Sequence, residues 1–330
     1  MNTFGRLFRV NIFGESHGSC VGILIDGTPA GIRICIDDFV KDISRRNPKI
    51  SGTTQRKESD LPYVISGVFN GFTTGGPILI IFENQKQKTR DYDLLRDIPR
   101  PGHADFTAKI KYGNFNDYRG AGPFSGRMTV GLVAAGVIAK KLINNINIRA
   151  ELVEVAGSKK IDYEVKKAIK NKDSVGGIIQ CKINKLPVGL GEPFFDSMES
   201  LISHIIFSIP GIKGIEFGAG FRASSMSGSE YNDTLLNIAG KTKTNNSGGI
   251  NGGISNGNEL VFKVAVRPSA SISKEQQTIN LRTGKNQKIS VLGRHDACFA
   301  LRVPVIVEAV SAIVIADLMC LEQKIKRIKI

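Results

Sequence analysis

The sequence predicts a globular protein of the α+β class. Short apolar or β-branched runs bounded by Gly, Pro or Asp fill much of the first hundred residues, which indicates strands joined as hairpins. Helical patterns come later, and one near the C-terminus is apolar on nearly all sides. Such a helix has to be covered on several sides, so we expect it inside the core or against another subunit.

The expected strands fall into two groups along the chain. The early runs are residues 21–25, 32–36, 63–68 and 78–82, and the later ones are residues 177–183 and 260–266. Each run has the length and the β-branched or apolar content of a strand, and turn-forming residues bound it. We therefore expect hairpins among the early runs and further strands at the two later ones.

Two apolar helices are expected at residues 129–143 and 303–321. The first is rich in helix formers, ends in lysines and follows a glycine-rich loop. The second is long enough to resemble a membrane span, but Glu308 and Asp317 interrupt it and Pro304 suits a helix start. We interpret it as a buried helix and expect no membrane association.

A third helix is predicted from Met198 to Ile209. Apolar residues recur there at the spacing of one helical face, Asp196 or Ser197 can cap the start, and Pro-Gly follows the end. His204 lies off the apolar face. We expect this histidine to be exposed and without a catalytic role.

The net charge points to small anionic ligands. Lys+Arg number 45 and Asp+Glu 30, so the formal charge is +15. Most arginines stand singly beside Gly, His or Ser, whereas nucleic-acid-binding proteins tend to carry basic runs or interleaved aromatics. A guanidinium binds phosphate or carboxylate bidentately, so we expect pockets for multiply charged small molecules and no nucleic acid.

The length, the linker content, the cysteines and the N-terminus bear on the number of domains and on the cellular compartment. The length allows two ordinary domains, but no linker divides the chain, and we expect one domain over residues 1–330. Residues 245–257 form a glycine- and asparagine-rich stretch that suits either a linker or a folded loop near a ligand. The scattered cysteines lack a C-x-x-C pair and the N-terminus lacks a long apolar run, so a cytoplasmic protein is expected.

Three of the four histidines stand in motifs suited to a site, namely G-E-S-H-G at 14–18, R-P-G-H-A-D-F at 100–106 and G-R-H-D at 293–296. Imidazoles beside arginines suit proton transfer on bound anions. The spacing offers no metal-ligand pattern, so no metal is expected. G-E-S-H-G matches the G-x-S-x-G pattern of the α/β-hydrolase nucleophile elbow. No long αβ framework precedes it, so we do not interpret the serine as a hydrolase nucleophile. No Walker or dinucleotide-binding motif is present.

Six motifs together resemble the chorismate synthase family. Besides F-G-E-S-H-G, R-P-G-H-A-D-F and G-R-H-D-A-C, the chain carries K-Y-G-N-F-N-D-Y-R-G at 111–120, L-G-E-P at 190–193 and N-S-G-G-I-N-G-G-I-S-N-G at 246–257, in the family's order. The resemblance covers essentially the whole chain. It implies a β-α-α-β sandwich with helices between antiparallel sheets, assembled as a homotetramer.

The implied activity is the last common step of the shikimate pathway. Such lyases convert 5-enolpyruvylshikimate 3-phosphate to chorismate and phosphate by a 1,4-anti elimination. They require reduced FMN (FMNH2) although no net redox change occurs, and the sequence leaves open whether this chain reduces its own flavin with NADPH. The alternative is a flavin-dependent oxidoreductase that acts on an anionic phosphorylated substrate.

The resemblance also assigns site residues. His103 would assist the departing phosphate as an acid, His17 would protonate or stabilise the flavin, Asp296 would relay the C6 proton, and Ser16 belongs to the same catalytic set. The anionic substrate would be held by Arg46, Arg56, Arg100 and Arg127. The flavin would be held by Ser125, Gly252, Arg267, Pro268, Ser269, Ala270, Ser271 and Arg294. From the residues alone, a helix cap is the favoured interpretation of Asp296.

Overall fold

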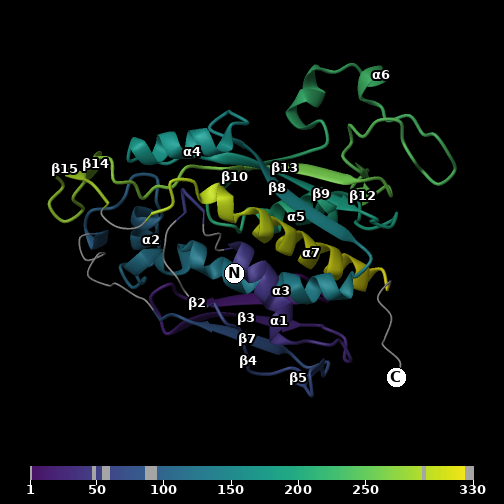
Figure 1. The fold of residues 1–330 in the computed structure, drawn as a ribbon, viewed down its shortest axis with the longest axis horizontal. Helices are drawn as coiled ribbons and strands as arrows, with labels where there is room; N and C mark the ends of the chain where they lie inside the picture. The colour runs from purple at the N-terminus through teal and green to yellow at the C-terminus, as the bar shows by residue number, and fades with distance from the viewer. Residues whose placement is uncertain (1, 47–49, 54–59, 86–94, 292–294, 324–330) are drawn as a thin grey trace.

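A computed structural model describes residues 2–46, 50–53, 60–85, 95–291 and 295–323. Two antiparallel sheets form the outer layers of this part, and two helices, α3 and α7, lie between them (Figure 1). Buried apolar side chains from both sheets and both helices form one cluster. This arrangement confirms the expected α+β sandwich, while the extent of the domain remains a prediction.

The first sheet is built from the N-terminal strands, in the order β1-β2-β3-β7-β4. Their bounds are β1 Thr3–Phe4, β2 Arg9–Gly14, β3 Cys20–Asp26, β7 Ile78–Glu83 and β4 Tyr63–Val64. Val21, Ile23 and Ile25 alternate along β3 and are fully buried. Because alternate residues of a strand share a face, this pattern directs one face of the sheet to the helices.

The second sheet has the order β10-β13-β9-β8. Its strands are β8 Asn147–Val155, β9 Gly177–Asn184, β10 Ile212–Phe217 and β13 Leu260–Val266. Helix α4 (Ile161–Lys170) packs against β8, and helix α5 (Met198–Ile206) packs against β10 and α7. Ser197 caps α5 by accepting a bond from the N–H of Ser200, and His204 is exposed, as the sequence predicted.

Helices α3 (Thr129–Leu142) and α7 (Pro304–Leu321) approach each other closely at Gly136. A Cβ there would lie 2.4 Å from the Cβ of Ala309, so only glycine permits this packing. By length and composition α7 could cross a membrane, but 78% of it is buried inside the protein. It is the core helix that the sequence predicted.

The two charges on α7 are both satisfied by the fold. Glu308 accepts two bonds of 2.7 Å from Arg45 on α1 (Ile36–Arg46) and one of 3.0 Å from the N–H of Ala150 on β8. Asp317 accepts bonds from three successive backbone N–H groups, at residues 6–8. A buried carboxylate needs such partners, so these residues tie both sheets to the central helix.

Two of the expected strands are wrong in extent. Residues 32–36 make only an isolated bridge between Arg33 and Phe72, and α1 already begins at Ile36. Asp37 and Asp38 fall in the first helical turn, where negative charge is favourable. Residues 63–68 divide into β4, which pairs with β7, and the start of β5, which pairs with β6.

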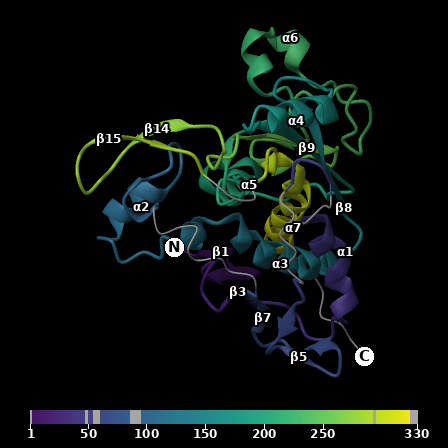
Figure 2. The same cartoon turned by 60° about the vertical axis from the view of Figure 1, so that its left-hand side comes forward.

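The remaining elements are short, and among them α6, β5 and the β14–β15 pair lie at the periphery (Figure 2). Residues 245–257 fold as a hairpin, so the folded-loop alternative holds and the linker alternative is wrong. The short strands are β5 Val68–Phe69, β6 Phe72–Thr73, β11 Ile250–Asn251, β12 Ile254–Ser255, β14 Gln276–Ile279 and β15 Asn286–Ile289. The short helices are α2 Asp105–Lys111, α6 Gly228–Tyr231, η2 Arg119–Phe124, η3 Gly126–Met128, η4 Phe194–Asp196, η5 Gly220–Ser225 and η6 Phe299–Arg302.

Candidate active site

A cavity of about 290 Å³ lies where loops from both layers meet. Its walls come from the end of α1, the turn before α2, the η2 and η3 helices, the segment after β13 and the turn before α7. Several predicted site residues line it, namely Arg46, Arg100, His103, Ser125, Arg127, Arg267, Pro268, Ser269, Ala270, Ser271 and Asp296. Segments far apart in the sequence therefore converge at this cavity, while the roles of these residues remain a prediction.

One wall of the cavity is a buried cluster of two arginines around Asp60. Arg46 donates to one Asp60 oxygen at 2.5 Å and Arg127 donates to the other. The side chains of Arg46, Arg127 and Asp60 are 10%, 6% and 4% exposed. Burial raises the pKa of Asp60, but the two guanidinium groups outweigh it and hold the pKa below its ordinary value.

Arg46 retains a donor for a ligand. Among the described residues its buried Nε has no hydrogen-bond partner. An unsatisfied buried N–H is costly, and an anion in the cavity would relieve that cost. Arg127 is fixed by bonds from Nε to the Asn84 Oδ1 (3.0 Å) and from Nη2 to the Glu83 carbonyl (3.0 Å), which orient it before any ligand arrives.

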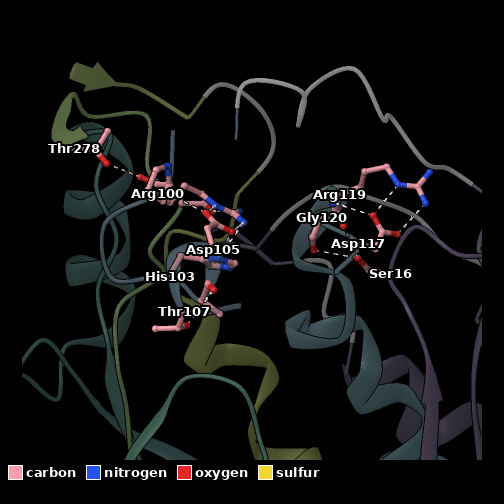
Figure 3. Close-up of polar contacts among 12 residues, drawn as sticks. Ser16, Arg100, His103, Asp105, Thr107, Asp117, Arg119, Gly120 and Thr278 are labelled. Atoms are coloured by element: carbon pink, nitrogen blue, oxygen red, sulfur yellow. Dashed lines mark hydrogen bonds and ion pairs between the residues drawn. The ribbon is translucent and has the colours of Figure 1, made fainter. Parts of the chain in front are cut away.

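The second wall carries His103 with Arg100 and Asp105 (Figure 3). The His103 Nδ1 lies 2.6 Å from Asp105 Oδ1, and Arg100 donates to both Asp105 oxygens at 2.7 and 2.8 Å. Burial lowers the pKa of His103; the bond to Asp105 opposes that effect, and the charge of Arg100 adds to it. The pKa of Asp105 is lowered because its bonds to Arg100 and His103 outweigh its burial.

Ser16 lies beside Gly120 of η2, apart from the His103 wall (Figure 3), and it contacts His17. Ser16 Oγ lies 3.2 Å from His17 Nδ1 and donates to the Gly120 carbonyl at 3.0 Å. Both residues are buried and do not line the cavity, whereas Gly120 does. A Cβ on Gly120 would lie 2.1 Å from the His17 ring, so the histidine sits directly behind the cavity wall.

The predicted flavin segment after β13 is held in place by the His103 wall. Arg100 Nη1 donates to Ser271 Oγ at 3.0 Å, and burial lowers the pKa of Arg267. Ser125 accepts a bond from the N–H of Arg127 at the start of η3. Gly252 is exposed in the β11–β12 turn and does not line the cavity. Arg56 and Arg294 lie outside the described residues.

Asp296 is bound by an arginine and caps no helix. Arg302 donates to its two oxygens from Nε (3.0 Å) and Nη2 (3.1 Å), and to the Arg46 carbonyl from Nη1 (3.2 Å). The residue before η6 is Cys298, which makes no side-chain cap. The helix-cap interpretation of Asp296 is therefore wrong. Arg302 fixes the carboxylate and the end of α1 together.

The sequence analysis missed three residues of the site: Asp60 and Arg302, which line the cavity, and Asp105, which contacts His103. Asp60 stands in an ordinary polar stretch, and only the fold brings it to two arginines. Asp105 lies inside the R-P-G-H-A-D-F motif, two residues after His103, which is a signal that could have been used. Arg302 precedes an apolar helix, where a lone cation suggests a buried partner.

The donor set fits an anionic ligand and does not fit a metal. Among the described residues, no group of three His, Cys, Asp or Glu side chains could hold a metal ion. The cavity instead gathers Arg46, Arg100, Arg127, Arg267 and Arg302. Such a set suits phosphate and carboxylate groups, including those of FMN and of a phosphorylated acid.

Comparisons with known proteins agree with this site. A family profile described as chorismate synthase matches residues 8–320. A chorismate synthase of Chitinophaga pinensis is 59% identical over 329 residues, 99% of each chain, and one of Methanocaldococcus jannaschii is 42% identical over 97% of this chain and 96% of its own. A crystal structure of a chorismate synthase shares the fold with a TM-score of 0.74, 24% identity and coverage of 97% of this chain and 93% of that one.

Motifs, cavity and relatives lead to one conclusion. The chain belongs to the chorismate synthase family, the lyases that form chorismate in the shikimate pathway.

Proposed function

We propose that this chain eliminates phosphate from 5-enolpyruvylshikimate 3-phosphate by the 1,4-anti route, using reduced FMN without net redox change. The observation that carries the proposal is the convergence of Arg46, Arg100, Arg127, His103 and Asp296 on one cavity. The substrate brings a phosphate and two carboxylates, and these arginines match such a set of charges. The unpartnered Nε of Arg46 supports a ligand anion on that wall.

Proton transfers are assigned to opposite parts of the same cavity. His103 would donate a proton to the departing phosphate from Nε2, because its Nδ1 is engaged with Asp105. Asp296 would receive the proton lost from C6, and the Arg302 fork would orient its carboxylate. His17 would act on the flavin from behind Gly120, with Ser16 fixing its ring.

Reduced FMN, when bound, would supply an electron-rich ring that assists the departure of phosphate. Ser125 and residues 267–271 would hold it, since they line the cavity. The roles of Gly252, Arg56 and Arg294 rest on the resemblance. A second candidate function, a flavin-dependent oxidoreductase, would use the same basic cavity.

We also propose a cytoplasmic homotetramer that binds neither nucleic acid nor membrane. Phe194, Phe195 and Phe221 are 86%, 91% and 84% exposed in the single chain. Large exposed aromatic side chains are enriched in protein interfaces, so contacts between subunits would explain them. Sedimentation equilibrium would measure the mass, and a monomer at micromolar concentration would contradict this part of the proposal.

Phosphate release under anaerobic conditions tests the activity. With reduced FMN we expect many turnovers while the flavin absorbance stays that of the reduced form, and without it we expect none. Flavin oxidation in step with product formation would instead support the oxidoreductase. Adding NADPH to oxidised FMN in the same assay would show whether the protein reduces its own flavin.

A further inference from the structure

We infer that Asp105 is a positioning residue that fixes the tautomer and orientation of His103, so that the Nε2 atom faces the substrate. The inference rests on the proposed function for the identity of that substrate, and on the structure for the geometry. Asp105 does not line the cavity proposed to hold the substrate and the flavin. Its action would pass through the histidine.

The contacts of Asp105 allow only one arrangement of protons. A carboxylate can only accept hydrogen bonds, so the 2.6 Å contact between Asp105 Oδ1 and His103 Nδ1 places the proton on Nδ1. Arg100 Nη2 also lies 3.1 Å from Nδ1; with the proton on Nδ1 both atoms are donors, so Nη2 would donate to Asp105 Oδ1 (2.7 Å) instead. Neutral His103 therefore keeps its lone pair on Nε2.

Asp105 is itself rigidly held. Its Oδ2 accepts from the Arg100 Nε (2.8 Å) and the Arg100 backbone N–H (3.0 Å), and its Oδ1 accepts from Arg100 Nη2 (2.7 Å). Thr278 of β14 donates to the Pro99 carbonyl at 2.7 Å, which anchors the turn that carries Arg100. The side chains of Arg100, Asp105 and His103 are only 4%, 10% and 14% exposed (Figure 3).

The charges around His103 set the effect of losing Asp105. Burial and the charges of Arg100 and Arg267 lower the pKa of His103, and Asp105 opposes them. Without the carboxylate the imidazolium would be less stable, so its pKa would fall further. Other charged or titratable groups line the two cavities that His103 borders, namely Arg46, Asp60, Arg127, His295, Asp296 and Arg302 on one side and Arg96, Lys109 and Asp117 on the other.

Asp105→Asn keeps the shape of the side chain at position 105 and should reverse the tautomer of neutral His103. The amide oxygen would take the Oδ2 position, where Arg100 presents two donors, so the amide NH2 would face His103 Nδ1 and donate to it. The ring proton would then sit on Nε2. A histidine of this kind contributes about 10²–10⁴-fold to the rate, and we expect kcat to fall within that range while KM changes less than threefold.

Nitrogen-15 NMR of ring-labelled histidine tests the geometry without any activity measurement. The chain has four histidines, and His103→Ala identifies the resonances of interest. Above its pKa, wild-type His103 should show a protonated Nδ1 and an unprotonated Nε2, and Asp105→Asn should exchange them. An Nε2–H tautomer in the wild-type protein would overturn the inference, whether or not the protein releases phosphate.

Kinetics then test whether Asp105 acts through His103. For an acid that must be protonated, activity is lost as pH rises through its pKa, so the alkaline limb of the kcat profile should move to lower pH in Asp105→Asn. The double variant with His103→Ala should be no slower than His103→Ala alone. An unchanged limb, or losses that multiply in the double variant, would overturn the inference.

Two further variants serve as controls. Asp97→Asn removes an ion pair with Lys109, which lies on helix α2 together with Asp105. This variant should leave kcat and the His103 tautomer unchanged. Asp105→Glu keeps the charge beside Arg100 but moves the carboxylate by one methylene. If Asp105→Asn does not fold, Asp105→Glu carries the test, and wild-type kcat in it would contradict a positioning role. A wild-type protein that releases no phosphate with reduced FMN would refute the proposed function, not the tautomer.

Discussion

Asp60 offers a sharp test of how the arginine wall is stabilised. Replacing it with Asn keeps the shape and removes the charge between Arg46 and Arg127, both of which are buried. Breaking a buried ion pair by removing one partner costs about 3–5 kcal/mol. Because the amide oxygen still accepts one hydrogen bond, we expect a loss of about 3 kcal/mol in the free energy of unfolding, at the lower end of that range.

The pH dependence of this loss follows from the sign of the pKa shift. The folded-state pKa of Asp60 lies below its ordinary value, so its charge stabilises the fold above the unfolded-state pKa, about 3.9. That contribution is lost as pH falls through the folded-state pKa. The difference between wild type and Asp60→Asn should therefore be constant from pH 8 to 5 and shrink below about pH 4.

Urea unfolding at several pH values measures the difference, with an unchanged slope as the sign of a stability effect alone. Asp26→Asn is the matched control, because Asp26 pairs with Arg9 on the surface, where both side chains are more than one-third exposed. Such pairs contribute at most about 1 kcal/mol. Equal losses in the two variants, or a loss at Asp60 that does not depend on pH, would refute the reasoning.

Five further substitutions test the catalytic assignments. His17→Ala and His103→Ala should each lower kcat by about 10²–10⁴-fold, whereas His204→Ala, at an exposed position, should not; equal impairment of a folded His204 variant would contradict the assignment. Asp296→Asn should slow single-turnover phosphate release by orders of magnitude with near-normal FMN affinity, and it should also lower the melting temperature because it leaves the buried Arg302 without its carboxylate partner; a destabilised variant with near-normal activity would make this residue structural. Gly120→Ala, at φ +56°, should cost about 1–2 kcal/mol for its backbone alone and displace the His17 ring, so wild-type activity would show that the ring is not needed there.

The fold was largely predictable where one local pattern dominates. The alternation of buried residues along β13 and the continuous apolar run of α7 both specify their elements, because burial on one face or on all faces leaves a direct trace in sequence. Residues 32–36 show the limit. Their apolar residues are typical of a strand, but the acidic residues that follow favour the start of a helix. Only packing decides between strand and helix at this position.

The site residues also fall into a group that was predictable from local sequence and a group that was not. Motifs and resemblance predicted Arg46, Arg100, His103, Arg127 and Asp296, all of which line the cavity, since glycine, histidine and arginine together leave a distinctive local signature. The partners of these residues had no such signature, because a carboxylate is common anywhere on a surface.

Asp60 and Arg302 acquire their roles only from groups brought to them by distant segments. Arg302 donates to the carbonyl of Arg46, 256 positions earlier in the chain, and Asp60 bonds Arg127, 67 positions away. The sequence by itself determined the family, the basic character and the histidines. Tertiary structure decided which charges are paired, because the pairing of buried charges depends on distance and burial, and neither is written in the order of residues.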